Sequence, residues 1–229
     1  MSTPQHAVVT GTSSGIGLAI AQTLLAGGWQ VSGLDRDAQV IRDAGFTAHA
    51  IDLTAPEQVS ALARTLPPAR ALVHAAGVMR TGKHGALPLE AGAEMWKIHV
   101  EAATRLAEAL LPGMPEGARI VLIGSRAASG IAGRSQYAAS KAALLGLARS
   151  WAAELIERGI TVNVISPAAT DTAMLRDPAR ANTAPKLPPI GRLIRPAEVA
   201  ALTAYLLSDA AAAITGQDIA ICGGASLTR

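Results

Sequence analysis

A tyrosine and a lysine lie four positions apart in an alanine-rich stretch, at Tyr137 and Lys141 of segment 135–141, which reads SQYAASK. We expect this segment to open a helix that runs to about Arg158, and a spacing of four places both side chains on one face. A free tyrosine has a pKa of about 10, so it acts as a base at neutral pH only where a positive charge favours the phenolate. Lys141 can supply that charge, and the pair therefore predicts acid–base chemistry. The alternative is that the Tyr137 ring packs in the core while Lys141 extends to solvent.

A glycine-rich loop, GTSSGIG at 11–17, follows the apolar run 6–10 and precedes an Ala/Leu-rich helix expected to end near Leu25. Glycines let the backbone turn tightly beside a phosphate group, and the N-terminus of a helix presents unpaired N–H groups to an anion. Strand, glycine loop and helix in this order predict a dinucleotide site.

Asp35 ends the next apolar run, 30–34. A carboxylate at this place can accept hydrogen bonds from both hydroxyls of the adenosine ribose, and it would repel a 2′-phosphate, so it predicts NAD rather than NADP. The alternative is that Asp35 caps a following short helix. Arg36 beside it could stack on adenine or weaken the preference for NAD.

Seven apolar runs are expected to form the strands that position these residues. They span 6–10, 30–34, 46–51, 71–77, 118–124, 159–165 and 217–222, and they alternate with expected helices ending near 25 and spanning 56–65, 88–111, 135–158 and 196–207. This alternation predicts an α/β fold with one doubly wound parallel β-sheet and helices on both faces. Ligands of such sheets bind at the carboxyl ends of the strands. The residues expected at these ends are Gly11, Asp35, Asp52, Gly77, Ser125 and Pro167.

Composition excludes several classes of function. The 229 residues, half of them apolar, suit one domain. The basic residues are scattered despite a net charge of +3, so we expect no nucleic-acid partner. The single cysteine, Cys222, excludes an intrachain disulfide, and the spacing of His74, His84 and His99 predicts no metal site. No signal sequence or membrane span is evident, so we expect a soluble, cytoplasmic protein without a membrane partner.

Taken together, the motifs resemble the short-chain dehydrogenase/reductase family over nearly the whole chain. Segment 10–17 resembles its cofactor loop, 74–77 (HAAG) resembles its Asn-Asn-Ala-Gly turn, and 166–172 resembles the segment that closes over the nicotinamide. Ser125, Tyr137 and Lys141 fall on its catalytic triad. The resemblance implies a single NAD(P)-binding Rossmann domain over 1–229, with a substrate lid at about 168–195.

The resemblance also implies roles for individual residues. Tyr137 is the general acid and base, Lys141 lowers the tyrosine pKa and holds the nicotinamide ribose, and Ser125 stabilises the reacting oxygen. The residues implied in cofactor binding are Gly11, Ser13, Ser14, Gly15, Ile16, Gly17, Asp35, Arg36, Asp52, Leu53, Ala75, Ala76, Gly77, Tyr137, Lys141, Pro167 and Thr170.

Four features depart from the family pattern. Ser125 and Tyr137 are one residue closer than usual, which predicts a trimmed loop. His99 stands where an asparagine usually holds the proton-relay water, and it either replaces the relay or has become structural. His74 replaces an asparagine that ties strand ends together, and Ala168 replaces a glycine after Pro167.

Two functions are compatible with these motifs. The first is an NAD-dependent dehydrogenase for a small secondary alcohol or its ketone, such as a cyclic diol, a polyol or sugar, or a 3-oxoacyl compound. The second is a non-catalytic protein that senses NAD on the same fold. In the expected lid, Arg176, Arg180 and Lys186 could meet an anionic group. The family also implies a homo-oligomer, a tetramer or a dimer.

Overall fold

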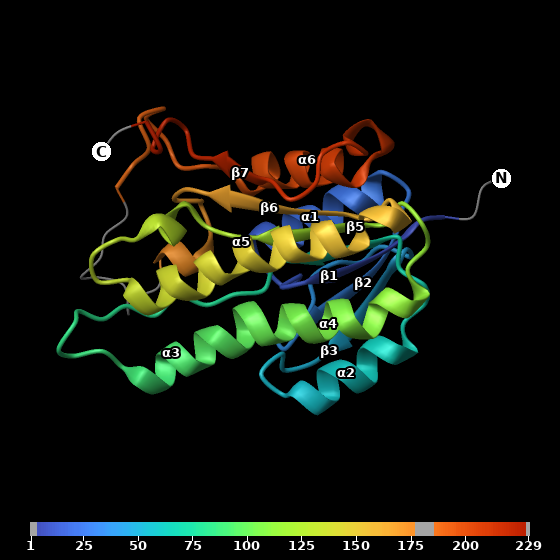
Figure 1. The fold of residues 1–229 in the computed structure, drawn as a ribbon, viewed down its shortest axis with the longest axis horizontal. Helices are drawn as coiled ribbons and strands as arrows, with labels where there is room; N and C mark the ends of the chain where they lie inside the picture. The colour runs from blue at the N-terminus through green and yellow to red at the C-terminus, as the bar shows by residue number, and fades with distance from the viewer. Residues whose placement is uncertain (1–3, 177–185, 228–229) are drawn as a thin grey trace.

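The computed structural model describes residues 4–176 and 186–227. Seven strands form one parallel sheet in the order β3-β2-β1-β4-β5-β6-β7. They are β1 (His6–Thr10), β2 (Gln30–Asp35), β3 (Phe46–Ala50), β4 (Ala71–His74), β5 (Arg119–Ile123), β6 (Thr161–Pro167) and β7 (Asp218–Ile221). The predicted doubly wound sheet of the Rossmann type is confirmed, and all seven expected strands are present (Figure 1).

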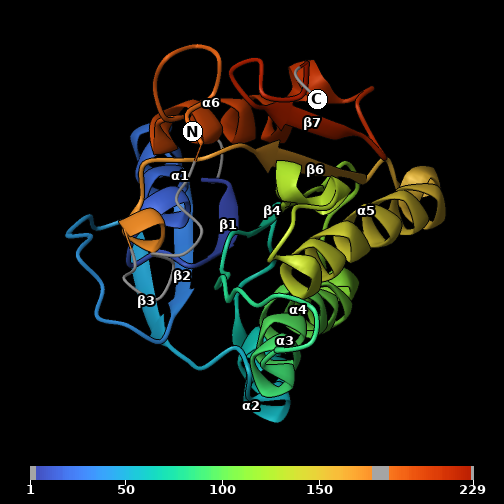
Figure 2. The same cartoon turned by 90° about the vertical axis from the view of Figure 1, so that its left-hand side faces the viewer.

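Helices cover both faces of the sheet, as the apolar strands require. One core cluster joins the sheet to α2 (Pro56–Thr65), α4 (Ala102–Leu110) and α5 (Ser135–Leu155). A second cluster joins the other face to α1 (Gly15–Ala26) and α6 (Pro196–Leu207). Figure 2 shows α1 and α6 on the opposite side of the strands from α4 and α5. Ala, Val, Leu and Ile dominate both clusters, which lets helices and sheet approach closely.

The chain starts in the middle of the sheet and reverses direction there. It passes from β1 outward to β2 and β3, then crosses back over β1 to β4. The carboxyl ends of β1 and β4 therefore border the crevice where doubly wound folds bind ligands. Gly11 follows β1 and Gly77 follows β4 soon after its last residue, so both lie at this crevice.

The expected helical stretch at 88–111 is present and contains one wide turn. The pattern over 88–111 predicts a single helix, but α3 (Leu89–Trp96) and α4 are separated by a π-helical turn, η1 (Lys97–Glu101). Hydrophobic periodicity does not distinguish an α-helix from an α-helix with one wide turn. The wide turn holds His99, whose ring is fully buried.

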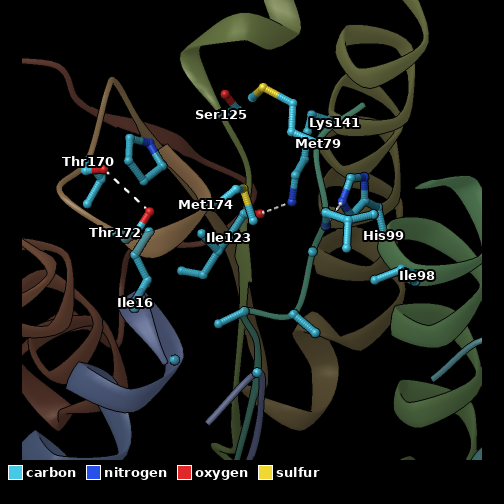
Figure 3. Close-up of a pocket in the computed structure, with 18 of the residues that line it drawn as sticks. Ile16, Met79, Ile98, His99, Ile123, Ser125, Lys141, Thr170, Thr172 and Met174 are labelled. Atoms are coloured by element: carbon cyan, nitrogen blue, oxygen red, sulfur yellow. Dashed lines mark hydrogen bonds between the residues drawn. The ribbon is translucent and has the colours of Figure 1, made fainter. Parts of the chain in front are cut away.

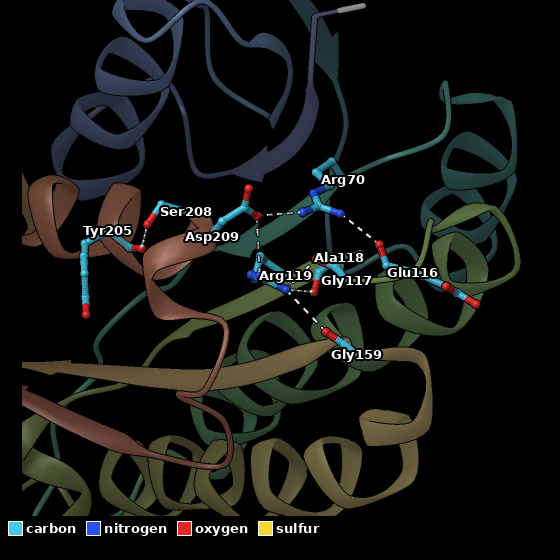
Figure 4. Close-up of polar contacts among 9 residues, drawn as sticks. All are labelled: Arg70, Glu116, Gly117, Ala118, Arg119, Gly159, Tyr205, Ser208 and Asp209. Carbon is cyan, nitrogen blue, oxygen red and sulfur yellow. Dashed lines mark hydrogen bonds and ion pairs between the residues drawn. The ribbon is translucent and has the colours of Figure 1, made fainter. Parts of the chain in front are cut away.

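At the amino ends of the central strands, two arginines contact one aspartate (Figure 4). Asp209, just after α6, lies 3.1 Å from Arg70 Nη2 and 3.8 Å from Arg119 Nη2. Arg70 precedes β4 and also donates to the Glu116 carbonyl at 2.8 Å, while the buried Arg119 begins β5. This contact links the starts of two central strands to the end of α6.

Candidate active site

A cavity of about 740 Å³ opens at the carboxyl ends of the central strands. Every residue that the sequence singled out for catalysis or cofactor binding lines this cavity. Parts of the chain that are more than 100 positions apart, such as the glycine loop and Ser125, thus meet around one space. Ligand pockets of proteins have volumes of roughly 300–1,000 Å³, so the cavity can hold a cofactor or substrate of ordinary size.

The glycine loop is built so that the backbone forms the cavity wall. A Cβ atom on Gly17 would lie 2.2 Å from the Gly11 carbonyl oxygen, and one on Gly11 would lie 2.9 Å from the Ala76 backbone. Gly11 also has φ +76°, which favours glycine. Helix α1 begins at Gly15 immediately after this loop, so its unpaired N–H groups face the space where a pyrophosphate would lie.

Asp35 connects the end of β2 to the glycine loop. Its Oδ2 accepts from the Ser13 N–H at 2.9 Å and its Oδ1 accepts from the Asp37 N–H at 3.0 Å. Residues 36–45, directly after Asp35, form no helix, so the alternative that Asp35 caps a following short helix is wrong. Arg36 is exposed and lies 3.9 Å from Asp37, with which it forms an ion pair.

The adenine end is completed by the segment after β3. The Asp52 carboxylate accepts from both the N–H and the hydroxyl of Thr54 at 2.8 Å, and these bonds lower the pKa of Asp52. Leu53 is buried beside it. A rigid carboxylate and an apolar side chain thus border the same end of the cavity as Asp35.

Ser125, Tyr137 and Lys141 are brought together from β5 and α5. Ser125 follows β5 and caps a short 3₁₀ turn, η3 (Arg126–Ser129), where its Oγ accepts from the Ala127 N–H at 3.1 Å. Tyr137 and Lys141 lie one turn apart near the start of α5, and both are buried. The trimmed loop before Tyr137 therefore does not prevent the three residues from lining one cavity.

Lys141 does not extend to solvent. It is 4% exposed, and its Nζ donates to the Ile123 carbonyl at 2.8 Å (Figure 3). Burial lowers the pKa of Lys141 to about 7, because the charged form loses hydration. A lysine with such a pKa in a cavity is typical of a functional site.

His99 has both ring nitrogens engaged. Nε2 accepts from the Val78 backbone N–H at 3.1 Å, and because a backbone N–H can only donate, the ring proton must lie on Nδ1. Nδ1 donates to Ser140 Oγ at 2.9 Å, and that hydroxyl donates to the Tyr137 carbonyl, also at 2.9 Å. The His99 ring packs edge-on against the Tyr137 ring, with centroids 5.6 Å apart. These contacts favour the structural alternative for His99 over a relay through its side chain.

His74 is held in the opposite tautomer. Its Nε2 donates to the Ile98 carbonyl at 2.9 Å, since a carbonyl can only accept. Thr10 Oγ1 accepts from the N–H groups of Ala75 and Ala76 at 3.0 and 2.9 Å, so its own proton is donated to His74 Nδ1 at 3.1 Å. His74 therefore ties β1 and β4 to the π-helical turn.

Both rings are held neutral. Burial lowers the pKa of His74 to about 3 and that of His99 well below its ordinary value, and the nearby Lys141 charge acts in the same direction. A Cβ on Gly77 would lie 2.9 Å from His99 Nε2 and 3.5 Å from Lys141 Nζ, so the histidine and the ammonium group face the same glycine. Protonating either ring would also place a donor against a donor.

The segment after β6 forms part of the cavity wall. Ala168 and Thr170 line the cavity, and the segment is held by the Ile194 N–H, which donates to the Ala169 carbonyl at 2.9 Å. No non-glycine residue of the described chain has a positive φ, so alanine fits at 168 without strain. In the expected lid, Lys186 lines the cavity, Arg176 pairs instead with Asp171, and Arg180 lies outside the described residues.

Several cavity residues were not singled out from the sequence. Apolar side chains from four separate segments line the catalytic end, where Figure 3 shows some of them as sticks, and arginines, among them Arg134, join them. Single apolar residues in loops carry no periodic signal, although the position of Arg126 directly after Ser125 could have been noticed. These residues include Met79, Ile98, Ile131, Met174, Leu175, Arg80, Arg126 and Arg134.

Two kinds of feature are absent from the described residues. No helix in them is long and apolar enough to cross a membrane. They also hold no group of three or more histidine, cysteine or acidic side chains arranged to bind a metal ion.

Comparisons with known proteins agree with this geometry. Residues 11–226 match a family model described as enoyl-(acyl carrier protein) reductase. The chain is 35% identical over 235 residues to the 3-oxoacyl-[acyl-carrier-protein] reductase FabG of Vibrio cholerae, covering 95% of this chain and 96% of that protein. It is 34% identical over 238 residues to the 2,3-dihydro-2,3-dihydroxybenzoate dehydrogenase of Escherichia coli, covering 96% of each.

Solved structures show the same relationship. A short chain dehydrogenase family protein from Francisella tularensis superposes with a TM-score of 0.90 at 25% identity, covering 99% of this chain and 100% of that chain. A blue fluorescent protein from a metagenomic library, solved in complex with NADPH, superposes with a TM-score of 0.85 at 30% identity, covering 96% and 97%. The matches extend over nearly the full length of both partners in each case, and the chain belongs to the short-chain dehydrogenase/reductase family of oxidoreductases.

Proposed function

We propose that the chain is an NAD-dependent dehydrogenase that interconverts a small secondary alcohol and its ketone. One observation carries the proposal: Ser125, Tyr137 and Lys141 line the same cavity as the glycine loop and Asp35. A hydride donor or acceptor held by the loop would thus share a space with an acid–base residue.

The cavity fits a dinucleotide on its own features. The glycine loop leaves no room for a Cβ at Gly17, and α1 begins beside it with unpaired N–H groups. Asp35 would accept from the adenosine ribose, while Lys141 and Tyr137 would meet the nicotinamide ribose at the other end. When bound, the nicotinamide supplies the hydride chemistry.

The protein's residues handle the proton and the developing charge. In oxidation the substrate C–H bond breaks and its electron pair leaves as hydride, while the Tyr137 phenolate takes the hydroxyl proton and a C=O bond forms; reduction reverses each transfer. Ser125 Oγ already accepts from Ala127, so its own proton is available for the reacting oxygen. Lys141 carries its charge below about pH 7, and that charge favours the phenolate.

The preference for NAD rests on the charges near Asp35. Asp35, Asp37 and Asp52 all line that end of the cavity, and the one nearby cation among the described lining residues, Arg36, is already paired with Asp37. A 2′-phosphate would therefore meet net negative charge. The NADPH bound in the metagenomic relative argues for the other cofactor, so the preference needs a direct measurement.

Titration with NADH and with NADPH, followed by tryptophan quenching, tests it. We expect NADH to bind at least about tenfold more tightly, which corresponds to about 1.4 kcal/mol, and Asp35→Ser to remove most of the difference. Asp43→Ser, outside the cavity, serves as the control. A preference for NADPH in the unchanged protein would refute the assignment.

Tyr137→Phe separates catalysis from sensing. We expect NADH binding to change less than about threefold, and turnover of any alcohol found by screening with NAD to fall at least about a thousandfold, since general acid–base catalysis contributes roughly 10²–10⁴-fold. Undiminished turnover in the variant would contradict the assigned base. A complete screen without turnover would favour the NAD-sensing alternative.

The substrate, assembly and compartment are proposals of the same kind. The names of the two curated relatives support 3-oxoacyl compounds and cyclic dihydrodiols as the first compounds to screen, before polyols and sugars. We further propose one Rossmann domain over 1–229 with a lid at about 168–195, a homotetramer or homodimer, and a cytoplasmic location. Light scattering of the purified protein tests the oligomer.

A further inference from the structure

The described residues that line the cavity are divided by charge. The acidic ones, Asp35, Asp37 and Asp52, all follow β2 or β3 at the adenosine end. The catalytic end has no described acidic residue in its lining and has instead several cations, namely Arg80, Arg126, Arg134, Lys141 and Lys186. The reacting part of the cavity is therefore a region of positive potential.

Most of these cations have a partner within the chain. Arg80 Nε lies 3.7 Å from the Glu94 carboxylate, and Lys141 Nζ donates to the Ile123 carbonyl. Arg126 and Lys186 form no side-chain hydrogen bond or ion pair with any described residue, and Arg126 is the less exposed of these two. All of the guanidinium donors of Arg126 are therefore available to a group that comes with a ligand.

Arg126 lies where such a partner would matter to the reaction. It directly follows Ser125 in the 3₁₀ turn that the Ser125 hydroxyl caps, so its position relative to the reacting oxygen is fixed by that turn. Apolar side chains from other segments surround the same end of the cavity, among them Met79, Ile131 and Leu175. A planar, permanently charged guanidinium beside an apolar wall suits a ligand with an apolar body and one anionic group.

We propose that Arg126 binds an anionic group of the substrate, so that the enzyme acts on alcohols or ketones bearing a carboxylate or phosphate close to the reacting carbon. This inference rests on the proposed function and specifies its substrate class. Arg126 is a specificity residue in this scheme. It forms charge-assisted hydrogen bonds to the anion, and it takes no part in the proton and hydride transfers.

Binding to the NADH-loaded protein tests the inference even while the natural substrate is unidentified. The probes are three carboxylates with their uncharged amides, namely benzoate, cyclohexanecarboxylate and acetoacetate, together with phenyl phosphate, at constant ionic strength and with NADH fluorescence as the signal. We expect at least one carboxylate to bind about tenfold more tightly than its own amide, or phenyl phosphate to bind about tenfold more tightly than benzamide. Tighter binding of phenyl phosphate than of benzoate would identify a phosphate ester, and the reverse a carboxylic acid.

Three variants locate the effect. Arg126→Gln is expected to lower anion affinity about tenfold while leaving amide and NADH affinity unchanged, and Arg126→Lys is expected to retain part of it. Arg149→Gln removes the same charge from an exposed position on α5 outside the cavity and should change nothing.

The results separate this inference from the function on which it rests. If NADH binds but no anion is preferred over its amide, or if the preference survives Arg126→Gln, the inference is refuted and the proposed function stands. If NADH does not bind, both fall.

Discussion

His99 offers the most demanding test of the site, because the cost of losing it can be worked out from its contacts. Replacing it with alanine removes the acceptor of the Val78 N–H, which is partly buried, and the donor to the buried Ser140. The lost hydrogen bond to Ser140 costs about 1 kcal/mol, and the Val78 N–H left without an acceptor costs about 1–3 kcal/mol. Loss of the edge-on contact with Tyr137 adds about 0.5–1.5 kcal/mol. We therefore expect His99→Ala to lower the free energy of unfolding by about 2.5–5.5 kcal/mol.

His99→Asn is the informative partner variant. An asparagine amide has one acceptor and two donors, so it can accept from Val78 and donate to Ser140 in place of the two ring nitrogens. Because the side chain is shorter, we expect a smaller loss of about 1–2 kcal/mol. Urea unfolding followed by tryptophan fluorescence measures both, with His84→Asn as a surface control.

Kinetics of the same variants distinguish positioning from proton relay. If the ring only holds Val78 and Ser140, His99→Asn should keep turnover within about tenfold and leave the pH profile in place. Equal destabilisation by asparagine and alanine, or a cost below about 1 kcal/mol for alanine, would refute the hydrogen-bond assignment. A normal stability with turnover abolished in His99→Asn would instead return the relay to the histidine.

Three further predictions follow from buried groups. His74 has a pKa of about 3 in the folded protein against an ordinary value of 6.5, so between these pH values the unfolded chain binds more protons than the folded one. As the pH is lowered from 6.5 to 3, the free energy of unfolding should therefore fall by up to about 1.4 kcal/mol per pH unit. This slope should be smaller in His74→Asn. Lys141 has a pKa of about 7, so it is mostly uncharged at pH 7.5. A bound cofactor brings negative phosphate charge to the cavity and should raise this pKa, so that the protein takes up a proton on binding. A pH indicator dye measures the uptake, which should be absent in Lys141→Met. Gly17→Ala places a Cβ 2.2 Å from the Gly11 carbonyl oxygen and should abolish NADH binding or folding, whereas Gly113→Ala, where the Cβ meets open space, should do neither.

The sheet and most helix boundaries could be predicted because local signals agree with the global fold. Pro56 and Pro196 mark helix starts that the structure reproduces to the residue, and each apolar run became a strand. Because ligands of such sheets bind at the carboxyl ends of the strands, Asp35 and Ser125 could be placed on the same side of the sheet, although the sequence does not show their individual contacts. A fold can be predicted from a sequence where the local helix and strand signals agree with the overall arrangement in this way.

The substrate end could not be predicted, for a physical reason. Its wall is assembled from single side chains on loops, such as Met79, Ile131 and Met174, which repeat at no period and come together only through the fold. The π-helical turn at 97–101 was missed for a related reason: the apolar face continues through it, and the turn makes contacts with distant elements that the sequence does not show. His74, on β4, contributes one such contact through the Ile98 carbonyl.

The charges of the two buried histidines, His74 and His99, and of Lys141 influence one another. An ammonium group as deeply buried as Lys141 is costly, and a second positive charge beside it would raise that cost further. Histidine is a hazardous choice for such a place, because it is the residue that most readily gains charge near neutral pH. The structure avoids the hazard by burying both rings and by presenting a donor to one nitrogen of each, the Val78 N–H to His99 Nε2 and the Thr10 hydroxyl to His74 Nδ1. The tautomers are thereby fixed from outside the rings, and Lys141 keeps the only titratable positive charge among the three at neutral pH, which is the condition that a phenolate at Tyr137 requires.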